Sequence, residues 1–340
     1  MVSVMVESLR ATAKRTAAVA AELSGLLKYK RKQSGLIIVM LHKINDESDA
    51  LQLTLRPELL DAILTEIGAS HEFVCMDDIE AKGSDRESQG GLKFAITFDD
   101  GYRDNYDLAL PILKKHGAPA IIYLSTAHID GKTAFWFEQL AAALSTTTEQ
   151  YLDLKSTGFG TRSLETGNDR VSALRWLNAR LKEYDQERRE TIVREILEKT
   201  VGKTSLQVRP MLDWSLVREM SRAGVRFGSH TVTHPILSKE ESERVVHELQ
   251  ESKNIIEKKA GLKVSSFAYP NGTKNDFDAS VIAEVRNAGY RNACTTISGI
   301  NRSDTPVYEL HRIGLHNAMC TDAMGRFDPL LFWSKVLAVF

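Results

Sequence analysis

A short apolar run that ends in two adjacent carboxylates and a glycine is the feature that most constrains this chain. Residues 94–98 are mainly apolar, and Asp99, Asp100 and Gly101 follow directly. This pattern is typical of a buried strand whose end turns at the glycine. Adjacent residues on an extended chain point to opposite sides, so Asp99 and Asp100 can act separately, one on a metal and one on a proton. A simple polar turn is the alternative, because these residues are common in turns.

Two histidines lie four residues apart in a second polar stretch at 228–235. His230 and His234 follow a short apolar segment, 225–227, that is typical of another strand. At this spacing two imidazoles can meet one ion from a helical turn, although Pro235 favours an irregular segment. With a carboxylate from another strand end they would form a three-ligand site with open positions, which suits a catalytic divalent metal. A structural or solvated histidine pair is the alternative interpretation.

Three short motifs follow one another along the chain, at 97–101, 230–235 and 267–272. Their order and spacing resemble those of the polysaccharide deacetylase family, the chitooligosaccharide deacetylase-like group also called carbohydrate esterase family 4. The similarity extends over about 37–315. It implies an α/β fold, a distorted (β/α) barrel of the polysaccharide deacetylase type with a helical insertion. It also implies metal-dependent removal of an N- or O-acetyl group from a sugar.

The resemblance also assigns roles to the polar residues. Asp100, His230 and His234 correspond to metal ligands, and Asp99 to the general base that takes a proton from water. Two imidazoles and one carboxylate favour Zn2+, while Co2+, Ni2+ or Mn2+ would fit the same ligands. A bound divalent metal lowers the pKa of water towards ~7 and polarises the carbonyl.

Two further catalytic residues come from the last predicted strand. The family takes its general acid from a Leu-x-His motif, and the similar stretch here has His316 directly after Leu315, with His311 as the alternative. The family's third motif also has an Arg two residues before its Pro, where this chain has Ala268. We hypothesise that Arg312 supplies the missing guanidinium from the neighbouring strand and orients the base.

Four residues are candidates for contact with the substrate. Backbone N–H groups near Tyr102 can help to hold the oxyanion, and Tyr269 and Pro270 belong to a turn over the predicted site. Trp214 can stack on a sugar ring or belong to the core. His42 ends the first predicted strand near the substrate groove of the family, but a core histidine is an equally good interpretation, so it stays outside the predicted catalytic set.

Alternating strands and helices predict a parallel, right-handed α/β arrangement. Strands are expected at 36–42, 73–76, 94–98, 120–125, 225–227, 264–269, 292–296 and 310–316. Helices are expected at 57–67, 106–115, 215–223, 240–259 and 279–288, with a polar loop at 82–91.

The chain divides into an N-terminal amphipathic helix at 1–33, a barrel at 34–328 and an apolar C-terminal segment at 329–340. The barrel contains a helical insertion at about 135–207, with helices from 135, at 171–182 and at 187–199. The insertion is either a solvated excursion or a lid that shapes the choice of substrate. The first helix and the basic cluster after it either pack on the domain or contact an anionic membrane surface. The C-terminal segment can pack on the barrel, on a second copy or on lipid.

Composition and charge narrow the function class. A net charge of −1 gives no basic field for nucleic acid, and three separated cysteines indicate free thiols in a reducing compartment. No apolar run reaches the ~18–20 residues of a membrane span, and the N-terminus lacks the apolar core of a secretory signal. We therefore expect a cytoplasmic location, possible contact with the inner membrane face, and action on a glycan precursor. The oligomeric state stays open.

The leading interpretation is removal of N-acetyl groups from an amino sugar in a polysaccharide, oligosaccharide or glycan precursor. The same scaffold also serves de-O-acetylation, deformylation of a lipid-linked sugar and hydrolysis of cyclic amides, because fold does not fix the substrate. A non-catalytic carbohydrate-binding protein is the alternative from another class.

Overall fold

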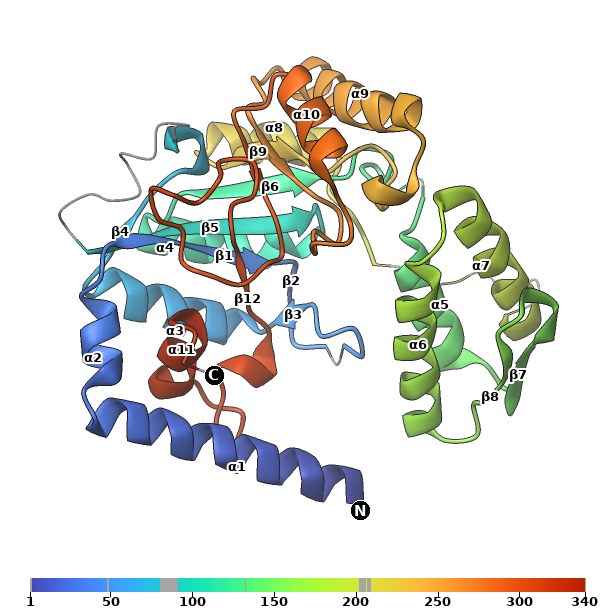
Figure 1. Cartoon of the computed structure of the whole chain (residues 1–340), viewed down its shortest axis with the longest axis horizontal. Coiled ribbons are helices and arrows are strands. Elements are labelled where there is room, and N and C mark those ends of the chain that lie inside the picture. The colour runs from blue at the N-terminus through green and yellow to red at the C-terminus, as the bar shows by residue number, and fades with distance from the viewer. Residues whose placement is uncertain are drawn as a thin grey trace.

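A computed structural model of the chain describes residues 2–47, 49–79, 91–131, 133–201, 206 and 209–339, with side chains from residue 13 onward. The polar loop predicted at 82–91 lies almost entirely outside these ranges. Helices surround a central curled sheet, and a separate helical lobe stands beside it (Figure 1).

The central sheet is parallel and buried. Its strands, in spatial order, are β11 (Asn292–Cys294), β10 (Ser266–Ala268), β9 (Arg226–Ser229), β6 (Ala120–Leu124), β5 (Leu92–Asp100), β1 (Gly35–Leu41) and β12 (Ile313–Gly314). The short β4 (Glu72–Phe73) pairs with the start of β5. Along β1, Ile37 and Val39 belong to the main hydrophobic core. Leu36 and Ile38 belong to a second hydrophobic cluster that also contains residues of other strands. Near-continuous apolar strands are what a sheet covered on both faces requires.

The segment at 310–314 closes the sheet into a distorted barrel. Its last two residues pair with β1, where Val39 lies opposite Ile313. Its first residue bonds to the opposite edge, since Leu310 N–H donates to Ala293 O at 2.9 Å and Thr295 N–H donates to Leu310 O at 2.8 Å. The two edges of the curled sheet are therefore joined through one short segment, which confirms the predicted distorted (β/α) barrel.

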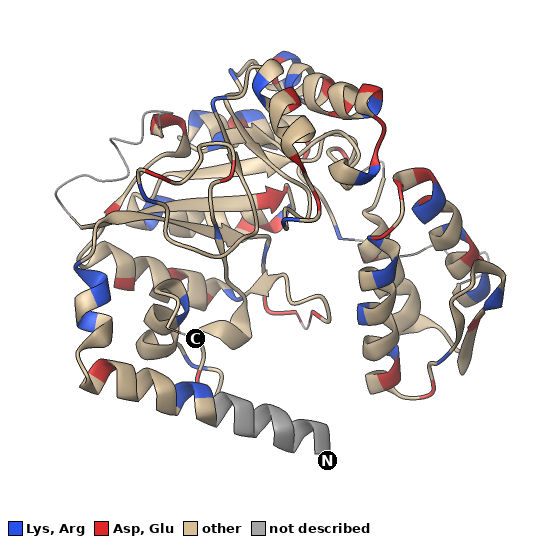
Figure 2. Cartoon of the chain, viewed as in Figure 1, with Lys and Arg blue, Asp and Glu red and all other residues tan. Residues whose placement is uncertain are grey.

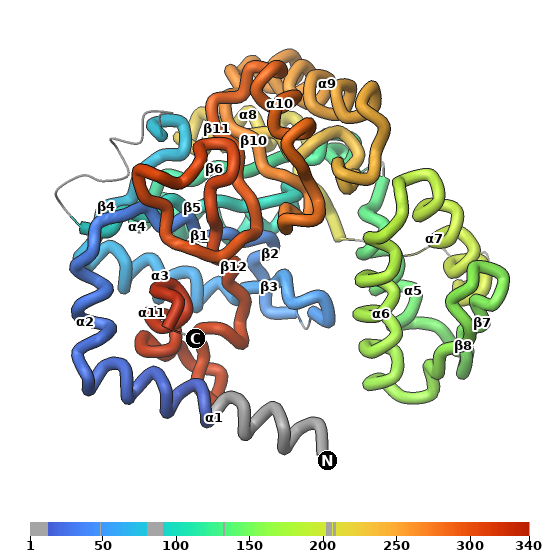
Figure 3. Tube along the Cα trace, viewed as in Figure 1, coloured from blue at the N-terminus to red at the C-terminus, as the bar shows by residue number. Residues whose placement is uncertain are grey.

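Helices on the outside connect successive strands, as predicted (Figure 3). They are α3 (Pro57–Gly68), α4 (Leu110–His116), α8 (Trp214–Arg222), α9 (Ser242–Ala260) and α10 (Ala279–Asn287). Local signals explain their ends: Asp213 and Asp278 accept hydrogen bonds from the first backbone N–H groups of α8 and α10. The helix predicted from 106 begins instead with a π-helical turn, η3 (Asn105–Ala109). Shorter elements are β2 (Lys43–Ile44), β3 (Thr54–Leu55), η1 (Met76–Asp78), η5 (Leu237–Lys239) and η6 (Asn317–Met319).

The insertion forms a small lobe around its own hydrophobic cluster. It contains α5 (Trp136–Thr146), β7 (Tyr151–Leu154), η4 (Lys155–Thr157), β8 (Gly160–Ser163), α6 (Gly167–Leu181) and α7 (Gln186–Thr200). The three helices were predicted, and the antiparallel β7–β8 hairpin between them was not. α6 starts four residues earlier than expected because Thr166 and Asp169 form a reciprocal cap at its N-terminus.

The two ends of the chain pack together beside the barrel. The predicted N-terminal helix divides into α1 (Val2–Leu23) and α2 (Leu26–Arg31), because Gly25 takes a left-handed conformation with φ 77°. α11 (Pro329–Val336) buries Phe332 and Trp333 in the main core, so the C-terminal segment packs on the barrel. Within the described ranges, none of the helices combines the length and apolar character that a membrane span needs. The three cysteines are free.

Candidate active site

The C-terminal ends of the barrel strands open into a cavity of about 500 Å³. Asp99 and Asp100 enter it from the end of β5, and His230 and His234 from the loop after β9. Residues of α6 line the side that faces these strand ends. In open α/β sheets and barrels this end of the strands is where ligands bind.

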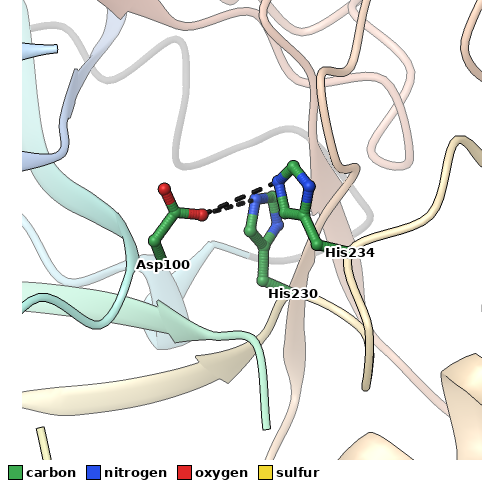
Figure 4. A group of neighbouring side chains, drawn as sticks. All are labelled: Asp100, His230 and His234. Carbon is green, nitrogen blue, oxygen red and sulfur yellow. Dashed lines mark ion pairs between the residues drawn. The ribbon is translucent and has the colours of Figure 1, made fainter. Parts of the chain in front are cut away.

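Three of the side chains that line this cavity point toward one another (Figure 4). The Oδ1 atom of Asp100 lies 3.7 Å from Nε2 of His230 and 3.6 Å from Nε2 of His234. One ligand atom from each residue lies within 4.8 Å of the other two, and all three residues are buried. Donor atoms on one tetrahedral ion lie about 3.4 Å apart when each bond is ~2.1 Å. The spacing therefore fits a single divalent cation.

The chemistry of the three groups fits a cation as well. Asp100 Oδ1 is buried and receives no hydrogen bond. His230 Nδ1 donates to the carbonyl of Ala268 at 2.7 Å, so its Nε2 presents a lone pair to the site. Burial lowers the pKa of His230 and of His234, which keeps both imidazoles in the neutral, ligating form. Burial and the neighbouring Asp99 raise the pKa of Asp100, an unfavourable state that a bound cation would relieve.

Asp99, the other carboxylate at the end of β5, is bound by an arginine. Both oxygens of Asp99 accept hydrogen bonds from Arg312, at 2.6 Å from Nη1 and 2.7 Å from Nη2. Arg312 is completely buried and is itself held by Thr295 O, which accepts from its Nε at 2.8 Å. Burial would raise the pKa of Asp99, but the Arg312 guanidinium lowers it below its usual value. Asp99 is therefore an ionised carboxylate with a fixed orientation beside the three converging side chains.

One histidine that was left outside the predicted catalytic set lies next to Asp99. His42 follows β1 and lines the cavity, with its Nε2 atom 4.0 Å from Asp99 Oδ2. Burial lowers its pKa to about 4, although the charge of Asp99 raises it. The parallel register of β1 and β5 explains the contact, because Leu41 lies opposite Phe98 and the next residues are His42 and Asp99. This register was not visible in the sequence.

Comparison with known proteins agrees with this geometry. The model of the polysaccharide deacetylase family matches residues 87–293, more than half of the chain. The chain belongs to the polysaccharide deacetylase family. A curated relative, YxkH of Bacillus subtilis (strain 168), is provisionally named a polysaccharide deacetylase and is 22% identical over 232 residues. The match covers 68% of this chain and 54% of that relative, so the chain spans about half of the relative's length.

Solved structures of deacetylases share the fold. The Streptococcus pyogenes deacetylase PplD, solved with acetate, superposes with a TM-score of 0.57 at 20% identity, covering 84% of this chain and 95% of that one. IcaB from Ammonifex degensii gives a TM-score of 0.57 at 17% identity, covering 90% and 97%. A polysaccharide deacetylase homologue from Bacillus anthracis gives 0.55 at 19% identity, covering 89% and 69%.

The histidine motif of this family member is an irregular loop and not the helical turn that the spacing allowed. Thr231 and His234 have left-handed backbones, with φ 69° and 58°. The loop is held from α9 by the buried carboxylate of Glu248, which accepts hydrogen bonds from the N–H groups of Val232 at 2.7 Å and Thr233 at 2.9 Å. Strained residues of this kind persist only where the surroundings hold them. Sequence reasoning missed Glu248, because nothing near it in the chain points to the loop.

The strand end before the loop is equally constrained. Asp100 has a positive φ of 75°, and Gly101 follows with φ 87°. A Cβ atom on Gly101 would lie 2.8 Å from Leu124 Cδ2 and 3.0 Å from Ile129 Cδ1, so a larger residue does not fit. This turn directs Asp100 towards the histidines, while Asp99 faces Arg312.

The two histidines predicted as candidates for the general acid lie away from the cavity. The described residues that line the cavity include His42 but neither His316 nor His311. His316 precedes η6 at its N-cap position without a side-chain capping bond, and burial lowers its pKa to about 4 with Lys335 and Lys14 adding to the effect. The geometry thus favours His42 over His316 as the histidine of the site.

The aromatic candidates are structural. Trp214 is 8% exposed and belongs to the main core, which favours the core alternative over stacking on a sugar. Tyr269 is fully buried, stacks on Phe277 and donates its hydroxyl to Tyr308 O at 3.0 Å. Tyr102 is also buried, with its hydroxyl 3.1 Å from Glu138 Oε1, so only its backbone remains a candidate for the oxyanion. Pro270 is buried, and the cavity is lined by the next residue, Asn271.

Proposed function

We propose that this protein is a metal-dependent hydrolase that removes N-acetyl groups from an amino sugar in a polysaccharide, oligosaccharide or glycan precursor. One observation carries the proposal: the buried cluster of Asp100, His230 and His234 shares a cavity with an ionised carboxylate, Asp99, that is fixed by Arg312. Membership of the polysaccharide deacetylase family supports the same reaction. Zn2+ is the metal that two imidazoles and one carboxylate favour.

Asp100, His230 and His234 would hold the metal, which when bound lowers the pKa of water and polarises the acyl carbonyl. Asp99 accepts the proton of the attacking water as the oxygen adds to the carbonyl carbon. Arg312 keeps this carboxylate ionised and fixes both of its oxygens, so that the water meets the base without reorganisation.

His42 completes the proton path. The leaving amine needs one proton when the C–N bond breaks, and Asp99 holds one after the attack. His42 Nε2 lies 4.0 Å from Asp99 Oδ2, and the neutral imidazole can relay this proton to the sugar nitrogen. The products are a carboxylic acid and a free amino sugar. The backbone N–H groups near Tyr102 remain the predicted oxyanion donors.

The test is release of acetate from N-acetylglucosamine oligomers by the purified protein, with and without a chelator. We expect activity that chelation abolishes, that added Zn2+ restores and that Asp99→Asn removes. Parallel assays for formate, for acetate from O-acetylated sugars and for ring opening of cyclic amides would identify the alternative substrates. Metal binding without hydrolysis of any acyl sugar would contradict the proposal and support a carbohydrate-binding protein.

The cytoplasmic location and a glycan precursor as the substrate remain predictions. Cell fractionation tests them, and mature protein found outside the cell would contradict the location.

A further inference from the structure

One wall of the catalytic cavity is built by the inserted lobe and not by the barrel. Helix α6 contributes Arg175, Asn178 and Ala179 to the lining, and its C-cap residue, Lys182, also lines the cavity. Their spacing places all four on one face of the helix. Basic residues recur along α6 (Figure 2). Two cations of this helix therefore face the same space as the predicted metal ligands.

Neither of these cations has a partner in the described part of the chain. No hydrogen bond or ion pair involves the guanidinium of Arg175 or the ammonium of Lys182, although both line the cavity. The other two arginines of α6 are engaged: Arg170 donates to Leu164 O at 2.9 Å, and Arg180 pairs with Glu183. Asn178 adds a buried side-chain oxygen, Oδ1, that receives no hydrogen bond. The two cations that this wall presents to the cavity thus lack a hydrogen-bond or ion-pair partner within the described part of the chain.

The carboxylates near Arg175 and Lys182 already have other partners. Asp99 is held by both nitrogens of Arg312, and Asp100 belongs to the predicted metal centre. Asp276 acts on Lys182 at a distance, but its carboxylate accepts hydrogen bonds from the backbone and the hydroxyl of Thr273, at 2.8 and 2.5 Å. Desolvation by the surrounding residues lowers the pKa of Lys182, although its side chain remains exposed to the cavity opening. A divalent cation in the site would make the cavity more positive still.

We infer that this wall binds an anionic group of the substrate, a carboxylate or a phosphate, close to the sugar that loses its acyl group. The inference rests on the proposed function and names the substrate class: an acidic N-acylated glycan or an amino-sugar phosphate. Arg175 provides the planar fork that matches carboxylate and phosphate oxygens, and Lys182 provides a point charge. The lobe then selects substrates by charge while the barrel supplies the chemistry.

The test compares three substrates: a neutral N-acetylglucosamine tetramer, a hyaluronan tetrasaccharide with carboxylates, and N-acetylglucosamine 1-phosphate. The double variant Arg175→Gln/Lys182→Gln is compared with Arg180→Gln, which removes a cation from the same helix outside the cavity. We expect kcat/KM for at least one anionic substrate to exceed that for the neutral one by tenfold or more. The double variant should reduce this preference at least tenfold, mainly through KM, and Arg180→Gln should not change it. The better anionic substrate distinguishes carboxylate from phosphate.

Binding of the same three sugars to the metal-loaded proteins, measured by calorimetry, separates this inference from the proposed function. If an anionic sugar binds and the double variant weakens it tenfold, but no sugar is hydrolysed, the anion site stands and the proposed function fails. If kcat/KM is equal for the neutral oligomer and the two anionic substrates, and the double variant changes all three values equally, the anion site is overturned while the proposed function stands. Equal affinity of the native and variant proteins for all three sugars would also overturn the anion site.

Discussion

Arg312 provides the sharpest test of how the base is held. Its guanidinium makes two charge-assisted hydrogen bonds, of 2.6 and 2.7 Å, to the buried Asp99. Arg312→Lys keeps the charge but loses the planar fork, so that one of the two bonds is lost. A hydrogen bond to a charged group contributes about 1.5–3 kcal/mol. If that bond orients the base in the transition state, kcat falls roughly 10- to 100-fold, since each ~1.4 kcal/mol is a factor of ten.

Removing the cation altogether has a second, separable effect. In Arg312→Ala the carboxylate of Asp99 stays buried without a partner, a change that costs about 3–5 kcal/mol of folding stability in comparable pairs. Loss of the guanidinium also leaves burial to raise the pKa of Asp99. The base is then protonated up to a higher pH, so the acid limb of the kcat profile moves to higher pH.

The assay is acetate release against pH, with metal content and thermal unfolding measured on the same samples. Metal content should stay at the native value, because Arg312 does not touch the three predicted ligands. Arg302→Ala, which removes an exposed cation that bonds to Gln33 and Ser34, serves as the control and should keep kcat within about twofold. Asp99→Asn/Arg312→Ala should be more stable than Arg312→Ala alone, because no unpaired charge is left. Unchanged kcat and an unchanged acid limb in both Arg312 variants would refute the reasoning.

The remaining predictions concern the loop, the proton path, an acidic side chain and the surface. Glu248→Gln should weaken metal affinity about 10- to 100-fold by loosening the histidine loop, measured by competition with a chelator; unchanged affinity would contradict this. His42→Ala should lower kcat about 100-fold or more, and His316→Ala less than threefold, by acetate release; the reverse order would restore His316 as the acid. Burial raises the pKa of Asp104 to about 6, so the contribution of this carboxyl group to native stability should fall as pH rises from 4 to 7. Asp104→Asn should remove roughly 1–2 kcal/mol of that loss, measured by urea unfolding, and an unchanged pH profile would count against it. Leu23 is 84% exposed and precedes the basic cluster at 28–32, so Leu23→Ser should reduce co-sedimentation with anionic vesicles; equal sedimentation would argue against membrane contact.

Local sequence signals predicted most of the barrel. Apolar runs gave the strands, and Pro57 and Gly261 marked the start of α3 and the end of α9. The paired aspartates and the two histidines also predicted which side chains would meet. These features depend on neighbours in the chain or on the family motifs, and both are readable in one sequence.

Features that depend on register or on distant packing were not predictable in the same way. His42 meets Asp99 only because β1 and β5 pair with Leu41 opposite Phe98. Trp214 and Tyr269 were candidates for contact with a sugar, but both are buried in the core. Burial of their large apolar surface stabilises the fold, and a single sequence does not show which aromatic side chains are buried in this way. The β7–β8 hairpin lacks a strong turn signature, so its strands were not distinguished from the loops around them.

The most direct test of the account is a titration of chelator-stripped protein with Zn2+ while acetate release from an N-acetylated amino-sugar substrate is followed. We predict no activity without metal, a rise that saturates at one equivalent per chain, and no response in Asp100→Ala. Full activity of the stripped protein, or an equal response in Asp100→Ala, would contradict the claim that Asp100, His230 and His234 hold the catalytic metal.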